Sequence, residues 1–162
     1  ESLALKKPSN VSHVDDFTIT GGVFTNGCFD IIHRGHTSLF EFCGNYSLRL
    51  PTIVAVNSDE SIRELKGPSR PVMKQEDRVA VLSSIRWIDH VVIFDTKSVL
   101  PVLKKIKPNV LIKGGDYNTK PCAVKDRIVG QEFVESYGGK VTTAPMIEGV
   151  STTNIIEKMG EK

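Results

Sequence analysis

Cysteine is scarce in this chain, and long apolar runs are lacking. Cys28, Cys43 and Cys122 are the only cysteines among 162 residues, and their odd number and wide spacing indicate neither a disulfide framework nor a zinc site. No apolar stretch approaches the ~20 residues of a membrane-spanning helix. The first residues lack the basic, apolar and small-residue regions of a signal peptide. We therefore expect a cytoplasmic protein in a reducing compartment, with no membrane partner.

An excess of charge of one sign is also lacking. The chain has 21 Lys and Arg against 19 Asp and Glu, a formal net charge of +2 at pH 7. This balance gives no reason to expect a nucleic-acid partner, although a local cluster of basic side chains would still bind phosphates. With 40% hydrophobic and 25% charged residues, the composition is that of an ordinary soluble domain with a core of its own.

Apolar runs alternate with helical patterns along most of the chain. Runs typical of buried strands are Val23–Thr25, Ile53–Val56, Val91–Phe94, Val110–Ile112 and a weaker one around Val141. Helical spacing between them is shown by Leu39, Phe42, Cys43 and Tyr46, by Val79, Leu82 and Ile85, by Val99, Val102, Leu103 and Ile106, and by Phe133 and Tyr137.

This alternation predicts one α/β domain over residues 18–162, after an N-terminal arm of residues 1–17 with one short helix. The expected fold is a Rossmann-like, doubly wound domain with a mainly parallel five-stranded sheet. In such sheets ligands bind beyond the carboxyl ends of the strands, where the strand order reverses. The loops that follow the strands are therefore where functional residues should lie.

The loop after the first predicted strand holds two histidines at the start of a helix. His33 and His36 are three residues apart and should face the same side, beside the free N–H groups and positive end of the helix. Gly35 between them leaves room for a flat group to approach the backbone. Taken alone, such a pair is more often two solvated histidines near a helix start. Here the pair also fits a site that stabilises charge on a phosphate.

Cations and hydroxyls follow later strands. Lys66 and Arg70 flank a Gly-Pro turn that would fold over a polyphosphate, the alternative being a solvated basic loop. Arg78 opens the next helix and serves either phosphate binding or helix solubility. Asp116 follows paired glycines and would accept from a hydroxyl, help to place a metal, or simply cap a turn. Ser151–Thr153 exceed the needs of helix capping and suit phosphate binding.

His33-Arg34-Gly35-His36 matches the His-x-Gly-His signature of the cytidylyltransferase-like nucleotidylyltransferases. The wider set resembles one branch of them, the heptose 1-phosphate adenylyltransferases, which in bacteria often form the second half of a bifunctional protein. Its members show, in order, stretches of the type Thr-Asn-Gly-Cys-Phe-Asp, Asn-Ser-Asp, Lys-Gly-x-x-Arg-Pro-Val, Lys-Gly-Gly-Asp-Tyr and Ser-Thr-Thr. All five occur here between Thr25 and Thr153.

The resemblance implies transfer of AMP from ATP to a sugar 1-phosphate with Mg²⁺ as cofactor, no protein metal ligand, and a homodimer. The implied catalytic residues are His33, His36, Lys66 and Arg70. Nucleotide and phosphate binding is implied for Thr25, Asn26, Gly27, Cys28, Phe29, Gly35, Arg78, Lys113, Gly114, Ser151, Thr152 and Thr153. Substrate binding is implied for Asp30, Asp59 and Asp116.

Three rival interpretations remain open. A cytidylyltransferase for a polyol or amino-alcohol phosphate usually has Arg-Thr before its Glu-Gly-Ile-Ser-Thr-Thr stretch, whereas Met146-Ile147 stand there in this chain. The missing arginine counts against CTP. An RNA-acting relative lacks support, because no basic stripe or aromatic platform is evident. The third is a nucleotide sensor without turnover. Residues 118–125 resemble a lengthened loop beside the presumed acceptor site, so the sequence leaves the acceptor's identity open.

Overall fold

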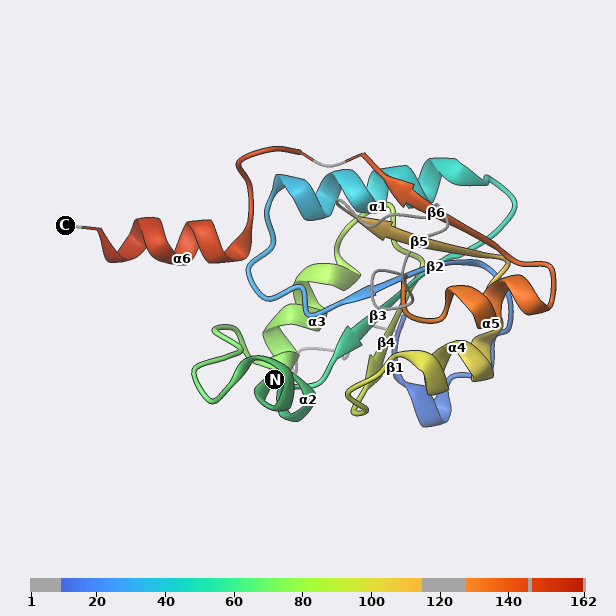
Figure 1. The fold of residues 1–162 in the computed structure, drawn as a ribbon, viewed down its shortest axis with the longest axis horizontal. Helices are drawn as coiled ribbons and strands as arrows, with labels where there is room; N and C mark the ends of the chain where they lie inside the picture. Colours follow the sequence, from blue (N-terminus) through green and yellow to red (C-terminus); the bar gives the residue numbers. More distant parts are fainter. Residues whose placement is uncertain (1–9, 115–127, 146, 162) are drawn as a thin grey trace, which may run out of the picture.

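The computed structural model describes residues 10–114, 128–145 and 147–161 as an α/β domain built on one sheet (Figure 1). The strands are β1 (Val11–His13), β2 (Val23–Gly27), β3 (Thr52–Asn57), β4 (His90–Phe94), β5 (Val110–Gly114) and β6 (Lys140–Ala144). The helices are the 3₁₀ turn η1 (Val14–Asp16), α1 (Arg34–Tyr46), α2 (Asp59–Lys66), α3 (Gln75–Ser83), α4 (Leu100–Ile106), α5 (Gln131–Ser136) and α6 (Thr152–Gly160).

The sheet is parallel throughout and has six strands in the order β1-β4-β3-β2-β5-β6. This confirms the predicted doubly wound architecture, but the number of strands is one more than the five predicted. The extra strand is β1, which pairs with β4 through Val11 and Val91. It belongs to the segment that the sequence assigned to an arm. Phe17, at the end of that segment, is buried in the core.

The strand order reverses between β2 and β5. From β2 the chain builds β3 and β4 on one side, and it then returns to add β5 and β6 on the other. The β2–β5 ladder covers Val23–Phe24 against Val110–Leu111, so the last residues of β2 lie beyond it. Such a reversal opens a crevice at the carboxyl edge of the sheet. Asn26 and Lys113 lie near the ends of β2 and β5, and thus at this crevice.

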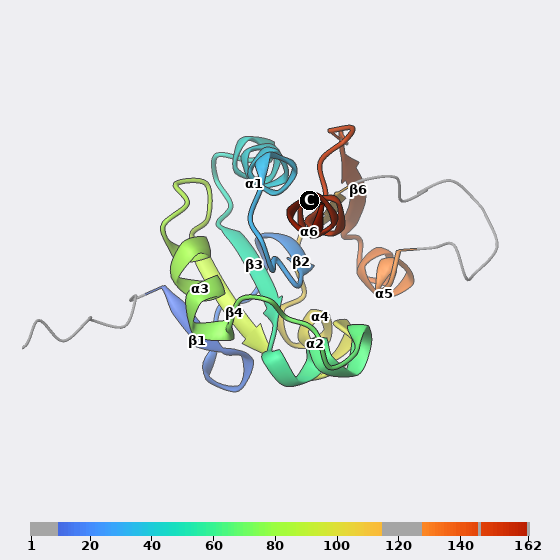
Figure 2. The ribbon, with the colours of Figure 1, turned by 90° about the vertical axis from the view of Figure 1, so that its left-hand side faces the viewer.

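Helices cover both faces of the sheet. Figure 2 shows α1 and α3 on one side and α4 and α5 on the other, and each side has its own buried cluster. On α1 the buried residues are Leu39, Phe40 and Cys43. Phe42, predicted to share the buried face, is only partly buried, because the helix turns Phe40 onto the sheet instead. Burial of Leu39, Phe40 and Cys43 sets which face of α1 packs on the sheet. The same packing determines where the histidines at the start of the helix point.

Helix α6 extends away from the sheet (Figure 1) and has no buried residue along its described length. Its amino end nevertheless returns to the sheet's carboxyl edge, since the Thr152 hydroxyl donates to the Ile31 carbonyl at 3.3 Å. None of the helices formed by the described residues combines the length and hydrophobicity needed to cross a membrane. The carboxyl edge is therefore bounded by the amino ends of α1 and α6.

Candidate active site

His33 and His36 cap the amino end of α1 with their own rings. The His33 Nδ1 accepts from the Gly35 N–H at 3.1 Å, and the His36 Nδ1 accepts from the His33 N–H at 3.2 Å. The rings stack with centroids 3.8 Å apart. Because both Nδ1 atoms accept, the proton of each neutral ring lies on Nε2. The two histidines therefore present Nε2–H donors from one place, as their spacing predicted.

Both imidazoles are held in the neutral form. Burial, together with the nearby His33 and Lys66, lowers the pKa of His36 to about 4. Burial also lowers the pKa of His33. At neutral pH the rings are therefore hydrogen-bond donors without full charge. An arriving phosphate would meet them together with the positive end of α1.

A cavity of about 280 Å³ opens beside these rings, and we call it the histidine cavity. It is lined by Asn26, His33, Gly35, His36, Leu39, Gly114, Pro145, Ile147 and Val150. Gly35 is required by the histidine beside it, because a Cβ there would lie 2.9 Å from the His33 ring. The predicted role of Gly35 in giving access to the backbone is thus joined by a steric one. The lining residues Leu39, Pro145, Ile147 and Val150 give the cavity apolar surface near the amino ends of α1 and α6.

Phe29 and its neighbours in the loop after β2 pack against His36 and shape the loop that leads to both histidines. Phe29 is buried, adopts a positive φ of 48°, and packs edge-on against His36 with centroids 5.5 Å apart. A Cβ on Gly27 would lie 3.1 Å from the Phe29 ring. Thr25 is fully buried, and Cys28, whose thiol pKa is raised by burial, points its Sγ toward Asn57. These residues, predicted to bind nucleotide, therefore shape the loop rather than line the cavity, whereas Asn26 lines it.

Asp30 fastens the cationic turn to the histidine loop. Its carboxylate is 4% exposed and accepts from the Val72 N–H and the Met73 N–H, both at 2.8 Å. The Arg70 guanidinium lies 3.9 Å from the same carboxylate. Asp30 was predicted to contact substrate, yet its oxygens are engaged within the protein. Asp30 thus acts as a tether, by which we mean a side chain that bonds one loop to another, and it fixes the position of the Lys66–Arg70 turn.

Arg78 is a second tether, and it is fully buried. Its guanidinium donates to the carbonyls of Met73 at 3.1 Å, Cys28 at 2.8 Å and Asn57 at 2.7 Å. It also pairs with the Asp59 carboxylate at 2.8 Å. Arg78 and Asp59 were predicted to bind phosphate and substrate, but in the structure they bind each other and three backbone segments. The loops after β2 and β3 and the segment before α3 meet at this side chain.

The cations of the turn lie next to the histidines. Lys66 is the last residue of α2, and Gly67 caps that helix with a φ of 93°. Lys66 is close enough to act on the pKa values of both His36 and Cys28. The Arg70 side chain is 18% exposed beside Asp30. The structure thus places Lys66 near His36, and Arg70 beside Asp30 in the loop that leads to the histidines.

Lys113 stands at the strand-order reversal and donates from Nζ to the Asn26 side-chain oxygen. Burial lowers the pKa of Lys113 to about 8. Gly114 lines the histidine cavity, as predicted for a nucleotide-binding residue. Asp116, the predicted substrate contact that follows, lies outside the described residues, as does the 118–125 loop. Lys113 is therefore a partly buried amine near the end of β5, beside β2.

The three hydroxyl residues Ser151–Thr153 stand at the start of α6 and have different partners. Ser151 caps the helix by accepting from the Asn154 N–H at 3.0 Å. Thr152 ties the helix to the histidine loop through Ile31. Thr153 is exposed. Of the three residues predicted to bind phosphate, the first two have structural partners, and the set still places the amino end of α6 beside that of α1.

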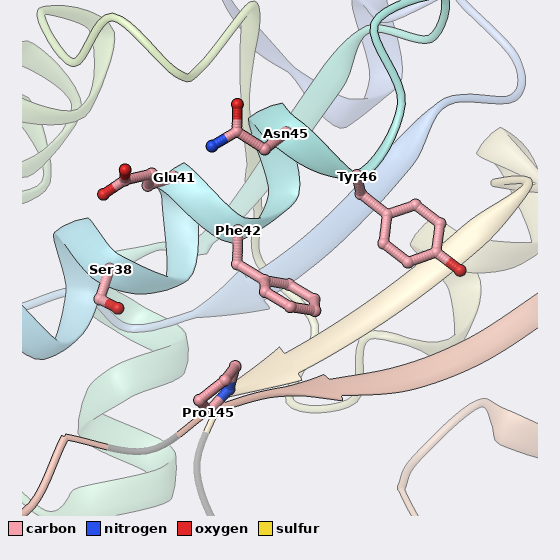
Figure 3. A pocket seen from close by; sticks show the side chains of 6 residues that line it. All are labelled: Ser38, Glu41, Phe42, Asn45, Tyr46 and Pro145. Carbon is pink, nitrogen blue, oxygen red and sulfur yellow. The ribbon is translucent and has the colours of Figure 1, made fainter.

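Two further cavities lie near this edge. One, of about 450 Å³, lies beside α1 near the end of β6 and is lined by Ser38, Glu41, Phe42, Asn45, Tyr46 and Pro145 (Figure 3). The other, about 470 Å³, is lined by Asn26, Asn57, Leu65, Phe94, Lys97, Ser98, Val99, Lys113 and Val129, and we call it the lysine cavity. Lys97 and Ser98 carry no motif; their only signal in the sequence is their position just after a buried strand.

The sheet, its order reversal, and the paired histidines at a helix start define a nucleotidylyltransferase of Rossmann-like fold. The chain belongs to the cytidylyltransferase-like family, whose model matches residues 24–158. It is 51% identical over 140 residues to the bifunctional protein HldE of Alcanivorax borkumensis, covering 86% of this chain and 28% of that protein. The HldE proteins of Gluconobacter oxydans and Koribacter versatilis are 45% and 49% identical, covering 85% and 84% of this chain and 27% and 26% of theirs.

The chain therefore spans about a quarter of the length of these curated relatives. Among solved structures, the macrolide-efflux protein from Streptococcus pneumoniae matches with a TM-score of 0.67 at 20% identity, covering 91% of this chain and 55% of that one. The lipopolysaccharide core biosynthesis protein from Thermoplasma volcanium matches with a TM-score of 0.61 at 20% identity, covering 78% and 97%. At this identity the two structures support the fold alone.

Proposed function

We propose that this domain transfers AMP from ATP to a sugar 1-phosphate, with heptose 1-phosphate as the favoured acceptor, and releases pyrophosphate. The observation that carries the proposal is the pair of stacked, neutral histidines with Nε2–H donors at the amino end of α1. The substrate assignment is supported by the motif set and by relatives named HldE. Family membership supports the reaction class.

The chemistry is an in-line displacement. An oxygen of the acceptor phosphate, already ionised at neutral pH, forms a bond to the α-phosphorus, and the bond from that phosphorus to the bridging oxygen of the β-phosphate breaks. The electron pair leaves with pyrophosphate, so no general base is required. His33 and His36 would donate to the oxygens on which charge accumulates. Lys66 and Arg70 would neutralise the departing pyrophosphate.

Mg²⁺ is the proposed cofactor, and it would supply charge neutralisation on the ATP phosphates. Magnesium keeps several waters and needs few protein ligands. Within the described ranges, no group of three or more His, Cys, Asp or Glu side chains is placed to hold a metal. The proposed ion would be held mainly by phosphate oxygens and water.

ATP should be used in strong preference to CTP. The histidine cavity has Pro145, Ile147 and Val150 on one wall, and Met146, outside the described residues, precedes Ile147. The side chains of Pro145, Ile147 and Val150 would pack against a purine but would supply no hydrogen bonds to a cytosine edge. Backbone groups near Gly114 and residues 146–149 would then read the adenine edge.

A pyrophosphate-release screen tests both substrates at once. It crosses ATP, CTP, GTP and UTP with a panel of sugar 1-phosphates and polyol phosphates, and the products are identified by mass. We expect an ADP-sugar as the main product, with heptose 1-phosphate the preferred acceptor. A CDP-linked polyol as the main product would support the rival cytidylyltransferase and overturn the proposed substrates. Nucleotide binding without any turnover would leave the nucleotide-sensor interpretation.

We also expect kcat/KM for the acceptor to fall as pH rises through about 8. The pKa of Lys113, lowered by burial to about 8, means that the amine is charged below this pH and loses its charge above it. The Cys28 thiol beside it has a raised pKa and stays neutral over this range. An acceptor dianion would favour the charged amine, so the fall in kcat should occur at higher pH than the fall in kcat/KM.

Lys113→Met is the variant that checks this assignment. It removes the amine while keeping an unbranched side chain of similar length in the partly buried position. Its kcat/KM should be low and should no longer fall near pH 8. If the fall persists unchanged in the variant, another group titrates and Lys113 does not govern the profile.

A further inference from the structure

The lysine cavity is built by the four central strands of the sheet. Asn26, Asn57, Phe94 and Lys113 come from the carboxyl-end halves of β2, β3, β4 and β5, and all four line it. Its volume of about 470 Å³ lies in the range of small-molecule sites, roughly 300–1,000 Å³. It lies toward the face covered by α4 and α5, because Val99 precedes α4 and Val129 precedes α5.

The lysine cavity and the histidine cavity share one wall. Asn26 lines both, while Lys113 lines the first and its neighbour Gly114 lines the second. Lys113 and Asn26 are joined by a hydrogen bond at the strand-order reversal. A nucleotide whose α-phosphate meets His33 and His36 would therefore have this wall next to its reacting phosphorus. The attacking acceptor phosphate must reach this phosphorus, and the lysine cavity supplies a space next to it across the wall.

The lining has the chemistry of a phosphorylated polyol site. Two lysines face the cavity and no carboxylate does, among the lining residues that the structure describes. Ser98 and Asn57 provide polar groups for hydroxyls. Leu65 and Val129 leave apolar surface unusually open, at 44% and 54% exposure, which suits the C–H face of a sugar ring.

We propose that the lysine cavity is the acceptor subsite, in which Lys113 and Asn26 meet the acceptor phosphate and Lys97 and Ser98 select the sugar by its hydroxyls. The proposal rests on the proposed transfer to a sugar phosphate and adds where that sugar lies. Lys97 and Ser98 belong to the loop between β4 and α4, outside every motif of the sequence. They are exposed and do not line the histidine cavity, so they can vary the acceptor without altering the nucleotide site.

The test compares acceptor and nucleotide affinities in two variants of the whole chain. In Lys97→Ala, the KM for heptose 1-phosphate should rise by about tenfold or more, the scale for losing a hydrogen bond to a charged group. In Ser98→Trp, the indole should fill the cavity and turnover should fall by at least a hundredfold. The Kd for Mg·ATP, measured by titration calorimetry, should stay within about twofold of wild type in both. Lys104→Ala, which removes an exposed lysine from α4, is the matched control and should leave both affinities unchanged.

Each outcome decides between the two proposals. If wild-type protein turns over no sugar phosphate in the screen, the proposed function fails and the acceptor subsite fails with it. If wild type is active and both variants keep a normal KM for the sugar, the function stands and the acceptor lies elsewhere. If both variants instead weaken Mg·ATP binding, the cavity belongs to the nucleotide and the subsite is overturned. Equal thermal unfolding midpoints of variants and wild type establish that the comparison concerns folded protein.

Discussion

Replacing His36 with alanine should lower kcat by about a hundredfold or more, with little change in the Kd for Mg·ATP. The Nε2–H of His36 would donate to phosphate oxygens whose charge grows in the transition state, so its loss acts on the rate more than on binding. Removal of one such preorganised donor typically costs two to three orders of magnitude, roughly, in kcat. The same substitution at His33 should act alike, because its ring stacks on that of His36.

The size of this effect depends on the neutral state of the ring. The His36 pKa of about 4 means that the donor is already in place across the neutral range, so wild-type kcat should show no step there from this residue. His36→Asn, which keeps an N–H donor of shorter reach, should recover part of the lost rate. His90→Gln, at the amino edge of the sheet, is the histidine control and should keep wild-type kcat. Near-normal kcat in both His33→Ala and His36→Ala would sink the catalytic assignment.

A strand could be predicted from the sequence when both of its faces are buried, because it then forms a continuous apolar run. All six residues of β3 are buried, so the run Ile53–Val56 stands out in the sequence. The edge strand β1 has one buried residue out of three and pairs on one side only, so no run marks it. A related limit explains why the burial of Phe40 was missed. A 3.6-residue repeat is compatible with more than one buried face of α1, and only packing against the sheet selects one.

The site was predictable where a residue's role is local to its loop. His33 and His36 face one side because they are three residues apart on one helix start, and the sequence contains that fact. Asp30 and Arg78 have partners 42 to 50 residues away along the chain, which no local pattern records. A charged residue at a loop or helix start is usually solvated, so burial of either one follows only from the assembled fold.

Asp30 and Arg78 explain how a turn of Gly, Pro and Ser can keep its flanking cations, Lys66 and Arg70, in a fixed position relative to the histidines. Asp30 accepts two backbone N–H groups at 2.8 Å from the segment that follows Arg70. Arg78 donates to the Met73 carbonyl in the same segment, and also to the carbonyls of Cys28 and Asn57. It thereby links that segment to the loops after β2 and β3. Both loops are thus fastened to one another before any substrate arrives. This is preorganisation, which lowers the cost of ordering Lys66 and Arg70 during the reaction.

Asp30→Asn should therefore lower kcat although Asp30 has no free oxygen for substrate. The substitution replaces one acceptor oxygen with an NH₂ group that faces a backbone N–H, so one of the two bonds to Val72 and Met73 is lost. Unfolding free energy should fall by about 1–3 kcal/mol, the cost of an unsatisfied buried donor. We expect kcat to fall by about tenfold or more, since the Lys66–Arg70 turn is released. Asp77→Asn, an exposed carboxylate on α3, is the matched control and should change neither quantity.

A double-mutant cycle separates this positioning role from simple loss of stability. If Asp30 acts through the cation of the turn, then Asp30→Asn should cost much less kcat in an Arg70→Ala background than in wild type, a coupling of roughly 0.5–3 kcal/mol. A purely structural effect would lower the folded fraction by the same factor in both backgrounds, and adding the two losses would then predict the double variant. Arg70→Ala alone should keep the wild-type unfolding midpoint within a few degrees, because its ion pair with Asp30 is long, at 3.9 Å. Additive losses in kcat at 15 °C, where all variants are folded, would remove Asp30 from the catalytic machinery and leave it a fold residue.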